Sequence, residues 1–445
     1  EWPVQNRFYG PSRLFAQPLM DAAYLNHLMQ AYRLLEPYAE PNRRQRWAQE
    51  LFLPQARMLG ESMPRIHNIA GFLRAAAAHV ALECGDEELW REAIDGPWGL
   101  RQQLEEGVTS DYFWFEQSIG YHEFIISGVV PLLHAAAARG RGAELEREMA
   151  IVRNMIHAPN GVRFADSTLP NPADNAALRL RYAPLNEILR NSYRVLPDAL
   201  SHQEARSARN WHTLIDPPPA AGEVEAAMPA VVSRHLESTR FAQLKADGWQ
   251  VFFHYGQLTG SHAQAELLNF EAYFGETPIT LDPHTVGYGS PLHAEYFTQG
   301  LCHNVPLING YGSSLPVDEV VSTELPQRGE MVRFDPEQHV MTARQADYRD
   351  GVSVERSLSI KAGALHDEVT LQAAGDAARS LGLAFHLQAV VEEGLDMESA
   401  SGFATNRSVA FQYWEDVRAQ RFRDHATFYA VCPDGQELEI RFILP

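Results

Sequence analysis

Apolar residues recur at every third or fourth position from Asp21 to about Leu214, which is the period of a helix with one apolar face. Short polar or Gly/Pro segments interrupt this pattern, and their spacing is typical of antiparallel helical hairpins. We therefore predict an all-α layer or toroid for this part of the chain. The runs that show the period best are Leu25, Leu28, Ala31 and Leu34; Ile69, Phe72, Leu73, Ala76 and Val80; and Leu178, Leu185, Ile188 and Leu189. The breaks are Pro37–Pro41, Gly85–Glu87, Gly107–Asp111 and Gly140–Gly142.

The pattern changes after Asp216, where consecutive prolines oppose both helix and strand pairing. Beyond it lie short β-branched and aromatic runs separated by Gly, Asp and Pro turn signals, as expected for an antiparallel β-sandwich. We predict an α+β multidomain chain with a helical domain at 1–215, a Pro-rich linker at 216–229 and an antiparallel β-sheet domain at 230–445. The predicted strands include Trp249–Tyr255, Glu271–Phe274, Val332–Phe334, Ser353–Ile360, Glu368–Ala373, Leu383–Leu387 and Glu437–Phe442.

The charge of the chain excludes some classes of partner. Its 445 residues include 37 Lys+Arg and 57 Asp+Glu, which gives a formal net charge of −20. Proteins that bind nucleic acid or anionic membranes need a basic face, so we predict neither partner. Lys245 and Lys361 are the only lysines, and the remaining cations are Arg, which pairs bidentately with carboxylate and sulfate but also follows base composition.

Nothing in the sequence predicts a membrane span, because the most apolar stretch, Ile125–Ala138, falls short of about 20 residues and contains Pro131. The chain opens at Glu1 without an initiator Met, which is compatible with removal of a signal peptide or of further N-terminal sequence. Its 3 cysteines form no C-x-x-C motif, and we predict small buried residues.

Three clusters could carry chemistry. Arg65-Ile-His67-Asn68 stands at a predicted helix entrance, where a cap and a satisfied histidine are the bland alternative. Gly120-Tyr121-His122 follows Trp114–Ile119, and its glycine lets a phenol and an imidazole approach a ligand, unless the run is only a packed aromatic helix start. The third and strongest cluster runs from Gly260 to Asn304, where polar residues interrupt strands that are otherwise apolar.

In order, the motifs RIHN, WFEQSIGYHEF, RFADSTLPNPAD, GSHAQAELLNFEAYFGETPITLDPHTVGYGSPLHAEYF and CHNVPLING resemble the heparinase II/III-like polysaccharide lyases, most closely the oligoalginate and heparin lyase branches. The resemblance extends from about residue 20 to 310. It implies an incomplete (α/α) toroid followed by antiparallel β-sheets, and a periplasmic or secreted enzyme that cleaves uronic-acid glycans by β-elimination. Such a reaction must neutralise the uronate carboxylate, remove the proton from carbon-5 and protonate the oxygen that leaves carbon-4.

The resemblance also implies roles for single residues. Tyr121 falls on the family's catalytic tyrosine, a general acid that can also serve as the base. His67 and Asn68 fall where the family places the Asn or His that grips the carboxylate or acts as base, and His262 is the second base candidate. Glu266 is expected to orient His262. The predicted substrate contacts are Arg65, Glu116, His122 and Tyr288.

The metal site departs from the family pattern. The family often carries a second His two residues after the first, an Asp near LDP and a His in the HN pair, which together hold a structural zinc. Here Gln264 replaces that His, while Asp282 and His303 remain. Zinc favours His and Cys over a neutral amide, so we predict no required cofactor and no stoichiometric metal. A structural zinc completed by Gln264, His284 or His293 is the alternative.

The sequence thus predicts a polysaccharide lyase acting on an alginate-type or glycosaminoglycan-type polymer, with a preference for exo action or for oligosaccharides. A non-catalytic acidic-glycan-binding protein is one alternative. A glycoside hydrolase on the same toroid is another, because the helical half holds carboxylates that could face each other across a groove. These carboxylates are Asp111, Glu116, Glu123, Asp166 and Asp174.

Overall fold

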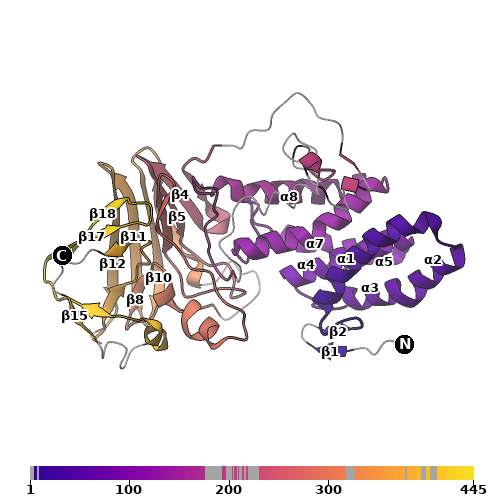
Figure 1. Cartoon of the computed structure of the whole chain (residues 1–445). Helices are drawn as coiled ribbons and strands as arrows, with labels where there is room; N and C mark the ends of the chain where they lie inside the picture. Colours follow the sequence, from indigo (N-terminus) through magenta and orange to yellow (C-terminus); the bar gives the residue numbers. More distant parts are fainter. Residues whose placement is uncertain are drawn as a thin grey trace. The chain divides into compact units, whose positions relative to one another are not determined.

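The computed structural model describes two compact units (Figure 1). The helical unit comprises residues 1–115, 121–160 and 182–230, and the sheet unit comprises 116–120, 161–181 and 231–445. The description covers residues 5–7, 10–175, 230–316, 326–375, 378–391, 397–400 and 408–444, with short stretches between 193 and 218. The predicted helix around Leu178–Leu189 lies outside the described residues, and so does the linker at 216–229 except for Pro217 and Pro218.

Helices dominate the first unit, as the apolar period predicts. They are α1 (Pro18–Leu35), α2 (Pro41–Trp47), α3 (Leu53–Gly60), α4 (Asn68–Cys84), α5 (Glu87–Asp95), α6 (Leu100–Gly107), α7 (Ile119–Ala138) and α8 (Glu146–His157). Short helical turns are η1 (Glu36–Tyr38), η2 (Ala48–Phe52), η3 (Gly142–Leu145) and η4 (Ala158–Gly161), and β1 (Gln5–Arg7) pairs with β2 (Gly10–Ser12).

Local sequence sets the helix ends. Gly85 ends α4 in the left-handed conformation at φ 70°, where a glycine carries no Cβ penalty. The side chain of Asp86 then accepts a hydrogen bond from the backbone of Leu89 and caps α5. Every residue of α4 except Cys84 is buried, and α1, α3, α5 and α6 contact this helix. α4 is therefore the central helix of its unit.

Antiparallel strands dominate the second unit. One sheet has five strands in the order β3 (Arg234–Leu236), β4 (Phe241–Ala246), β5 (Trp249–His254), β6 (Asn269–Phe274) and β7 (Thr277–Thr280). A second has four in the order β12 (Ala364–Ala373), β11 (Val352–Lys361), β10 (Val340–Arg349) and β9 (Glu330–Asp335).

Smaller strands and turns complete this unit. The strands are β8 (Pro306–Ile308), β13 (Leu381–Leu383), β14 (Val390–Val391), β15 (Glu398–Ser399), β16 (Arg418–Ala419), β17 (His425–Val431) and β18 (Glu437–Ile443). The turns are η5 (Glu237–Thr239), η6 (His293–Phe297), η7 (Gly300–Cys302), η8 (Pro326–Arg328) and η9 (Val409–Tyr413).

The two larger sheets share one apolar core. Phe253 of β5 and Ala272 of β6 belong to the same buried cluster as Met341 of β10 and Leu358 of β11. The prediction of antiparallel sheets is thereby confirmed. The incomplete (α/α) toroid and the sandwich stay predictions.

One predicted strand is confirmed only in part. In the run Leu383–Leu387, β13 ends at Leu383, and Leu387 forms an isolated antiparallel bridge with Thr280. Between them, the backbone N–H of Ala384 donates to the carbonyl of Val305 at 2.9 Å, and that of His386 donates to the Asn304 side chain at 2.6 Å. The Asn304 side chain thus takes a donor that a continuous strand would use for pairing. Within the described residues, no helix is long and apolar enough to cross a membrane.

Candidate functional site

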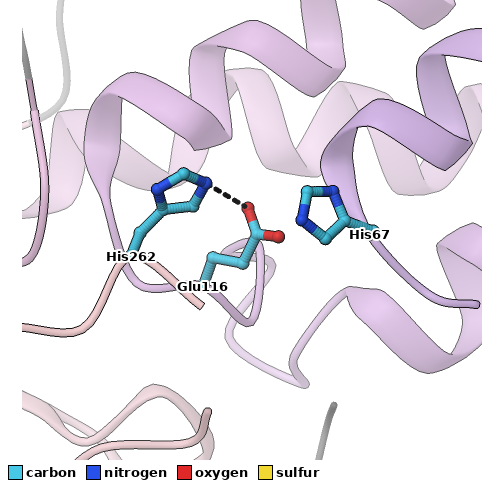
Figure 2. Close-up of side chains that lie close together, drawn as sticks. All are labelled: His67, Glu116 and His262. Atoms are coloured by element: carbon cyan, nitrogen blue, oxygen red, sulfur yellow. Dashed lines mark ion pairs between the residues drawn. The ribbon is translucent and has the colours of Figure 1, made fainter. Parts of the chain in front are cut away.

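His262 is the centre of a polar cluster in the sheet unit. Its Nε2 lies 3.9 Å from Oε2 of Glu116, and its Nδ1 lies 2.9 Å from the hydroxyl of Tyr288 and 3.5 Å from Oδ2 of Asp174 (Figure 2 shows the Glu116 contact). Glu116 and Asp174 are buried, whereas 14% of the His262 side chain and 57% of Tyr288 are exposed. The cluster therefore presents an imidazole held between two buried carboxylates to solvent.

The backbone of this cluster is held in place from several sides. The Gln117 side chain donates to the carbonyls of Thr239 and Gly256 at 2.7 and 2.8 Å, and accepts from the backbone of Leu258 at 2.9 Å. These bonds place residues 116–120 in the sheet unit, although the chain on either side belongs to the helical unit. Glu116 also accepts from the Ser261 hydroxyl at 3.2 Å.

His67 directly precedes α4 in the helical unit, as the N-cap that its position predicts. Its Nδ1 accepts from the backbone N–H of Ile69 at 3.2 Å, and the backbone N–H of His67 donates to Oε1 of Gln103 at 3.1 Å (His67 is drawn in Figure 2). Because Nδ1 is the acceptor, the neutral ring carries its hydrogen on Nε2. His67 can thus donate a hydrogen bond from Nε2, which suits a carboxylate grip better than proton abstraction.

The other residues predicted from these helices lie as follows. Asn68 is the first residue of α4 and is fully buried. Tyr121, near the start of α7, is partly buried, and its ring meets that of Phe124 edge-on at 6.3 Å between centroids. Arg65 is partly buried, and its carbonyl accepts from the Gln103 side chain at 2.8 Å.

His122 differs from the other predicted substrate contacts. Its Nδ1 accepts from the backbone of Trp114 at 3.1 Å, its Nε2 bonds the carbonyl of Met155 at 2.8 Å, and only 1% of the residue is exposed. Burial lowers the pKa of this histidine to about 4. Both ring nitrogens are used inside the helical unit, so we leave His122 out of the site.

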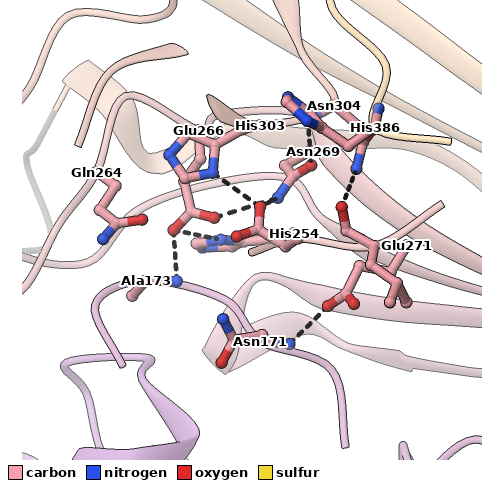
Figure 3. A network of polar contacts seen from close by, with 12 residues as sticks. Asn171, Ala173, His254, Gln264, Glu266, Asn269, Glu271, His303, Asn304 and His386 are labelled. Atoms are coloured by element: carbon pink, nitrogen blue, oxygen red, sulfur yellow. Dashed lines mark hydrogen bonds and ion pairs between the residues drawn. The ribbon is translucent and has the colours of Figure 1, made fainter. Parts of the chain in front are cut away.

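A second polar cluster lies deeper in the sheet unit (Figure 3). Nδ1 of His303 lies 2.8 Å from Oδ2 of Asp282, and Oε1 of Glu266 lies 3.4 Å from Nδ1 of His254. Burial raises the pKa of Asp282. Burial alone would lower the pKa of His303, but the Asp282 carboxylate outweighs it, so the pKa is raised.

This cluster changes one of the predictions. Glu266 contacts His254, the backbone of Ala173 and Asn269, and not His262, so its expected role as a partner of His262 is wrong. Asp282 and His303 contact each other directly, and the Asn269 amide donates to both Asp282 and Glu266. Oε1 of Gln264 is buried without a hydrogen-bond partner.

Glu266, Asp282 and His303 could supply ligands to a metal ion, but the hydrogen bonds within this cluster do not fit a metal ion. Single ligand atoms of Glu266, Asp282 and His303 lie within 4.8 Å of one another. The Asn269 amide, however, donates to Oδ2 of Asp282 and to Oε2 of Glu266, and it cannot be flipped because its oxygen accepts from the backbone of Asn304 at 3.0 Å. An N–H donor therefore joins the two carboxylates where a tetrahedral zinc would need open oxygens.

Sequence reasoning missed Asp174 as a member of the His262 cluster. Asp174 and His262 stand 88 residues apart in the chain, and their pairing is a long-range contact that no local pattern predicts. The signal in the sequence was the motif RFADSTLPNPAD, which ends at Asp174 and is rich in polar residues.

The comparisons with known proteins agree with this architecture. Residues 229–440 match the family model described as heparinase II/III-like, C-terminal. A mutant of the heparan sulfate lyase HepC from Pedobacter heparinus is similar in structure, with a TM-score of 0.63 and 16% identity over 96% of this chain and 60% of that chain. A heparinase III gene product gives 0.58 and 15% over 97% of this chain and 74% of that chain.

A further heparinase III structure gives a TM-score of 0.57 at 11% identity over 99% of this chain and 77% of that chain. Identities this low show a shared fold and no more. Among curated proteins, none matches this chain in sequence. The match over residues 229–440 confirms the resemblance for this part of the chain, which is similar to the heparinase II/III-like, C-terminal family.

Proposed function

We propose that the protein is a polysaccharide lyase that cleaves a uronic-acid glycan by β-elimination. The observation that carries the proposal is the His262 cluster, in which Nδ1 faces Tyr288 and Asp174 and Nε2 lies on the side of Glu116. The family match over residues 229–440 and the fold shared with a heparan sulfate lyase support it. Tyr121, the proposed general acid, follows Glu116 by five residues in the sequence.

The proposed reaction divides its three demands among three residues. The Nε2–H of His67 donates to the uronate carboxylate, with Asn68 and Arg65 assisting, and stabilises the charge that develops there. Nε2 of His262 takes the proton from carbon-5, and the electron pair of that C–H bond forms the double bond between carbon-4 and carbon-5. The bond from carbon-4 to its oxygen breaks, and the hydroxyl of Tyr121 protonates the leaving oxygen.

Glu116 and Tyr288 complete the proposed site. Once Nε2 of His262 holds the proton, the buried Glu116 carboxylate at 3.9 Å pairs with the imidazolium. Tyr288 is exposed enough to contact the sugar. The proposed substrate is of the alginate or glycosaminoglycan type, with exo action or a preference for oligosaccharides, and a periplasmic or secreted location follows by resemblance.

The product tests this proposal. Purified protein is incubated with a panel of uronic glycans, and the conjugated double bond of the new unsaturated uronate is followed in the near ultraviolet. A new reducing end without that absorbance would instead favour a hydrolase that uses Glu116 and Asp174, the two carboxylates that contact His262. Binding without either product would favour a glycan-binding protein.

Replacing Tyr121→Phe tests the general acid. We expect turnover on the best substrate to fall about 10²- to 10⁴-fold, with binding retained, because only the proton-carrying hydroxyl is lost. Tyr38→Phe is the matched control, since Tyr38 is 88% exposed on the same unit and has no proposed role. A Tyr121→Phe variant with the wild-type rate would remove Tyr121 from the mechanism.

A further inference from the structure

We propose that Asp174 is a positioning residue for His262: with Tyr288 it keeps a hydrogen on Nδ1 and so makes Nε2 the proton-accepting atom. This inference rests on the proposed function, and it gives a role to the RFADSTLPNPAD motif that the reaction itself does not use.

The direction of the hydrogen bonds carries the first step. The Tyr288 hydroxyl donates its only hydrogen to Oδ2 of Asp174, so its oxygen can only accept from a further partner. That partner is Nδ1 of His262 at 2.9 Å. An Nδ1 that faces a hydroxyl acceptor and, at 3.5 Å, a carboxylate acceptor must carry a hydrogen. In the neutral ring, Nε2 then holds the lone pair.

The backbone around Asp174 carries the second step. The N–H of Asp174 donates to the carbonyl of His262 at 2.9 Å, and the carbonyl of Asp174 accepts from the Ser118 hydroxyl at 2.7 Å. The preceding residue, Ala173, donates its N–H to Glu266 at 2.5 Å. Asp174 is therefore fixed to the histidine that it orients both through its backbone and through its carboxylate.

Backbone strain carries the third step. Ala173 and His262 both adopt left-handed conformations, each at φ 58°. Non-glycine residues persist there only where the surroundings hold them, and such strain collects at functional sites. The second cluster supplies the restraint, because Glu266 binds Ala173 and Glu271 binds the N–H of Asn171 at 2.5 Å. The buried carboxylates of the sheet thus hold the loop that presents Asp174.

Charged and hydroxyl groups face this imidazole from both of its nitrogens. Glu116 lies on the Nε2 side, and Asp174 and Tyr288 lie on the Nδ1 side. His293 stands behind Tyr288, with 4.7 Å between ring centroids, and its Nδ1 bonds the Thr285 hydroxyl. Asp174 is the acidic group on the Nδ1 side, so its removal is the change that should alter the tautomer.

The test replaces Asp174→Asn in the full chain. An amide can donate to Nδ1 and favour the opposite tautomer, so we expect kcat to fall about 10- to 100-fold with KM changed less than about threefold. Asp174→Glu should restore part of the loss because it returns the carboxylate.

Asp166→Asn is the matched control. Asp166 lies in the same segment and also accepts from a tyrosine, Tyr273 at 3.3 Å, but contacts no histidine among the described residues. We expect this variant to keep the wild-type kcat. Equal kcat for Asp174→Asn and Asp166→Asn would overturn the inference.

A second readout needs no turnover. Diethyl pyrocarbonate reacts with the ring nitrogen that holds the lone pair, and mass spectrometry of the peptide that contains His262 gives its modification rate at one fixed pH. Asp174→Asn should lower this rate, because the opposite tautomer carries a hydrogen on Nε2 and leaves the lone pair on Nδ1, which faces the Tyr288 hydroxyl. Asp166→Asn should leave the rate unchanged.

The two readouts separate the two proposals. A wild-type protein inactive on every uronan would refute the proposed function, while the modification rate of His262 would still decide on Asp174. An unchanged modification rate in Asp174→Asn would refute the positioning role even if the wild type is an active lyase.

Discussion

Ring hydrogen bonds distinguish the roles of the histidines at the scale of single residues. Both nitrogens of His122 are bound by backbone groups inside the helical unit. His67 uses Nδ1 in its cap, and His262 uses Nδ1 toward Tyr288 and Asp174. In the proposed reaction the reacting nitrogen is Nε2 in both candidates, as a donor in His67 and as an acceptor in His262. Residue type alone does not separate these cases.

The buried His122 should make stability depend on pH. Burial depresses its pKa from 6.5 to about 4, so the unfolded chain binds a proton that the folded chain refuses between these values. Its contribution to stability is complete above pH 6.5 and is lost as the pH falls toward 4. We expect the unfolding free energy of the wild type to drop by about 3 kcal/mol more than that of His122→Gln over this window.

Denaturant titrations at several pH values measure this difference. The Gln side chain can still accept from Trp114 and donate to Met155, so the variant is expected to fold. Parallel pH dependences of the two proteins would contradict the assigned role of His122.

Glycines set how closely two elements approach. A Cβ on Gly71 of α4 would lie 2.5 Å from Cδ1 of Ile125, and a Cβ on Gly128 of α7 would lie 2.4 Å from Cδ2 of Phe72. Each helix thus places a glycine against a large side chain of the other. This reciprocal packing brings α7 close to α4, the helix that begins at His67.

Adding a methyl group at this crossing should destabilise the unit. We expect Gly128→Ala to lower the unfolding free energy by about 1–3 kcal/mol, because the Phe72 ring is inside the core and has no room to move. Gly60→Ala at the end of α3 is the control, since no atom lies within 4 Å of its added Cβ. Thermal melts compare the two, and a Gly128→Ala variant as stable as Gly60→Ala would disprove the close packing.

The second polar cluster joins elements that are distant in the sequence, and it should do so without zinc. Asn269 is the first residue of β6, and its side-chain amide donates to both Glu266 and Asp282, so the two carboxylates already have N–H partners. We expect less than about 0.1 zinc per chain in protein purified without added metal, and a melting temperature that chelation leaves unchanged. Elemental analysis with about one zinc per chain would show that Glu266, Asp282 and His303 bind the ion by rearranging these bonds.

Elements could be predicted from the sequence where one period dominates. The helix around Ile69–Val80 and the strand Trp249–Tyr255 are confirmed as α4 and β5, because each has regular apolar positions. β10 was not predicted, since its sequence VMTARQADYR mixes charged and amide groups into an otherwise buried strand. Only the neighbouring strands β9 and β11 provide its pairing.

The same rule applies to the residues of the site. His67 and His262 could be identified from local motifs, whereas the tautomers of their rings depend on hydrogen-bond partners, some of which lie far away in the sequence. Glu266 lies two residues from Gln264, and the sequence could not tell which of them turns toward Asp282. The backbone decides this, because Leu268, between Glu266 and Asn269, has a left-handed φ of 61° that reorients the run before β6.

The net negative charge of the molecule opposes its association with the anionic substrate that we propose. A chain with 37 basic and 57 acidic residues repels a polyuronate before any contact is made. The local groups that bind a carboxylate act only at short range. Long-range association and short-range binding should therefore respond to salt in opposite directions.

Ionic strength tests this balance. Raising NaCl from about 10 mM to about 150 mM shortens the screening length from roughly 30 Å to 8 Å, which removes most of the repulsion between the net charge of −20 and a polyanion. We expect kcat/KM on a long polyuronate to rise over this range, and kcat/KM on a disaccharide of the same polymer to rise less, because the disaccharide carries fewer charges. Initial rates at low substrate concentration measure both. A fall in kcat/KM with salt would mean that a basic surface near the site dominates association despite the net negative charge of the chain.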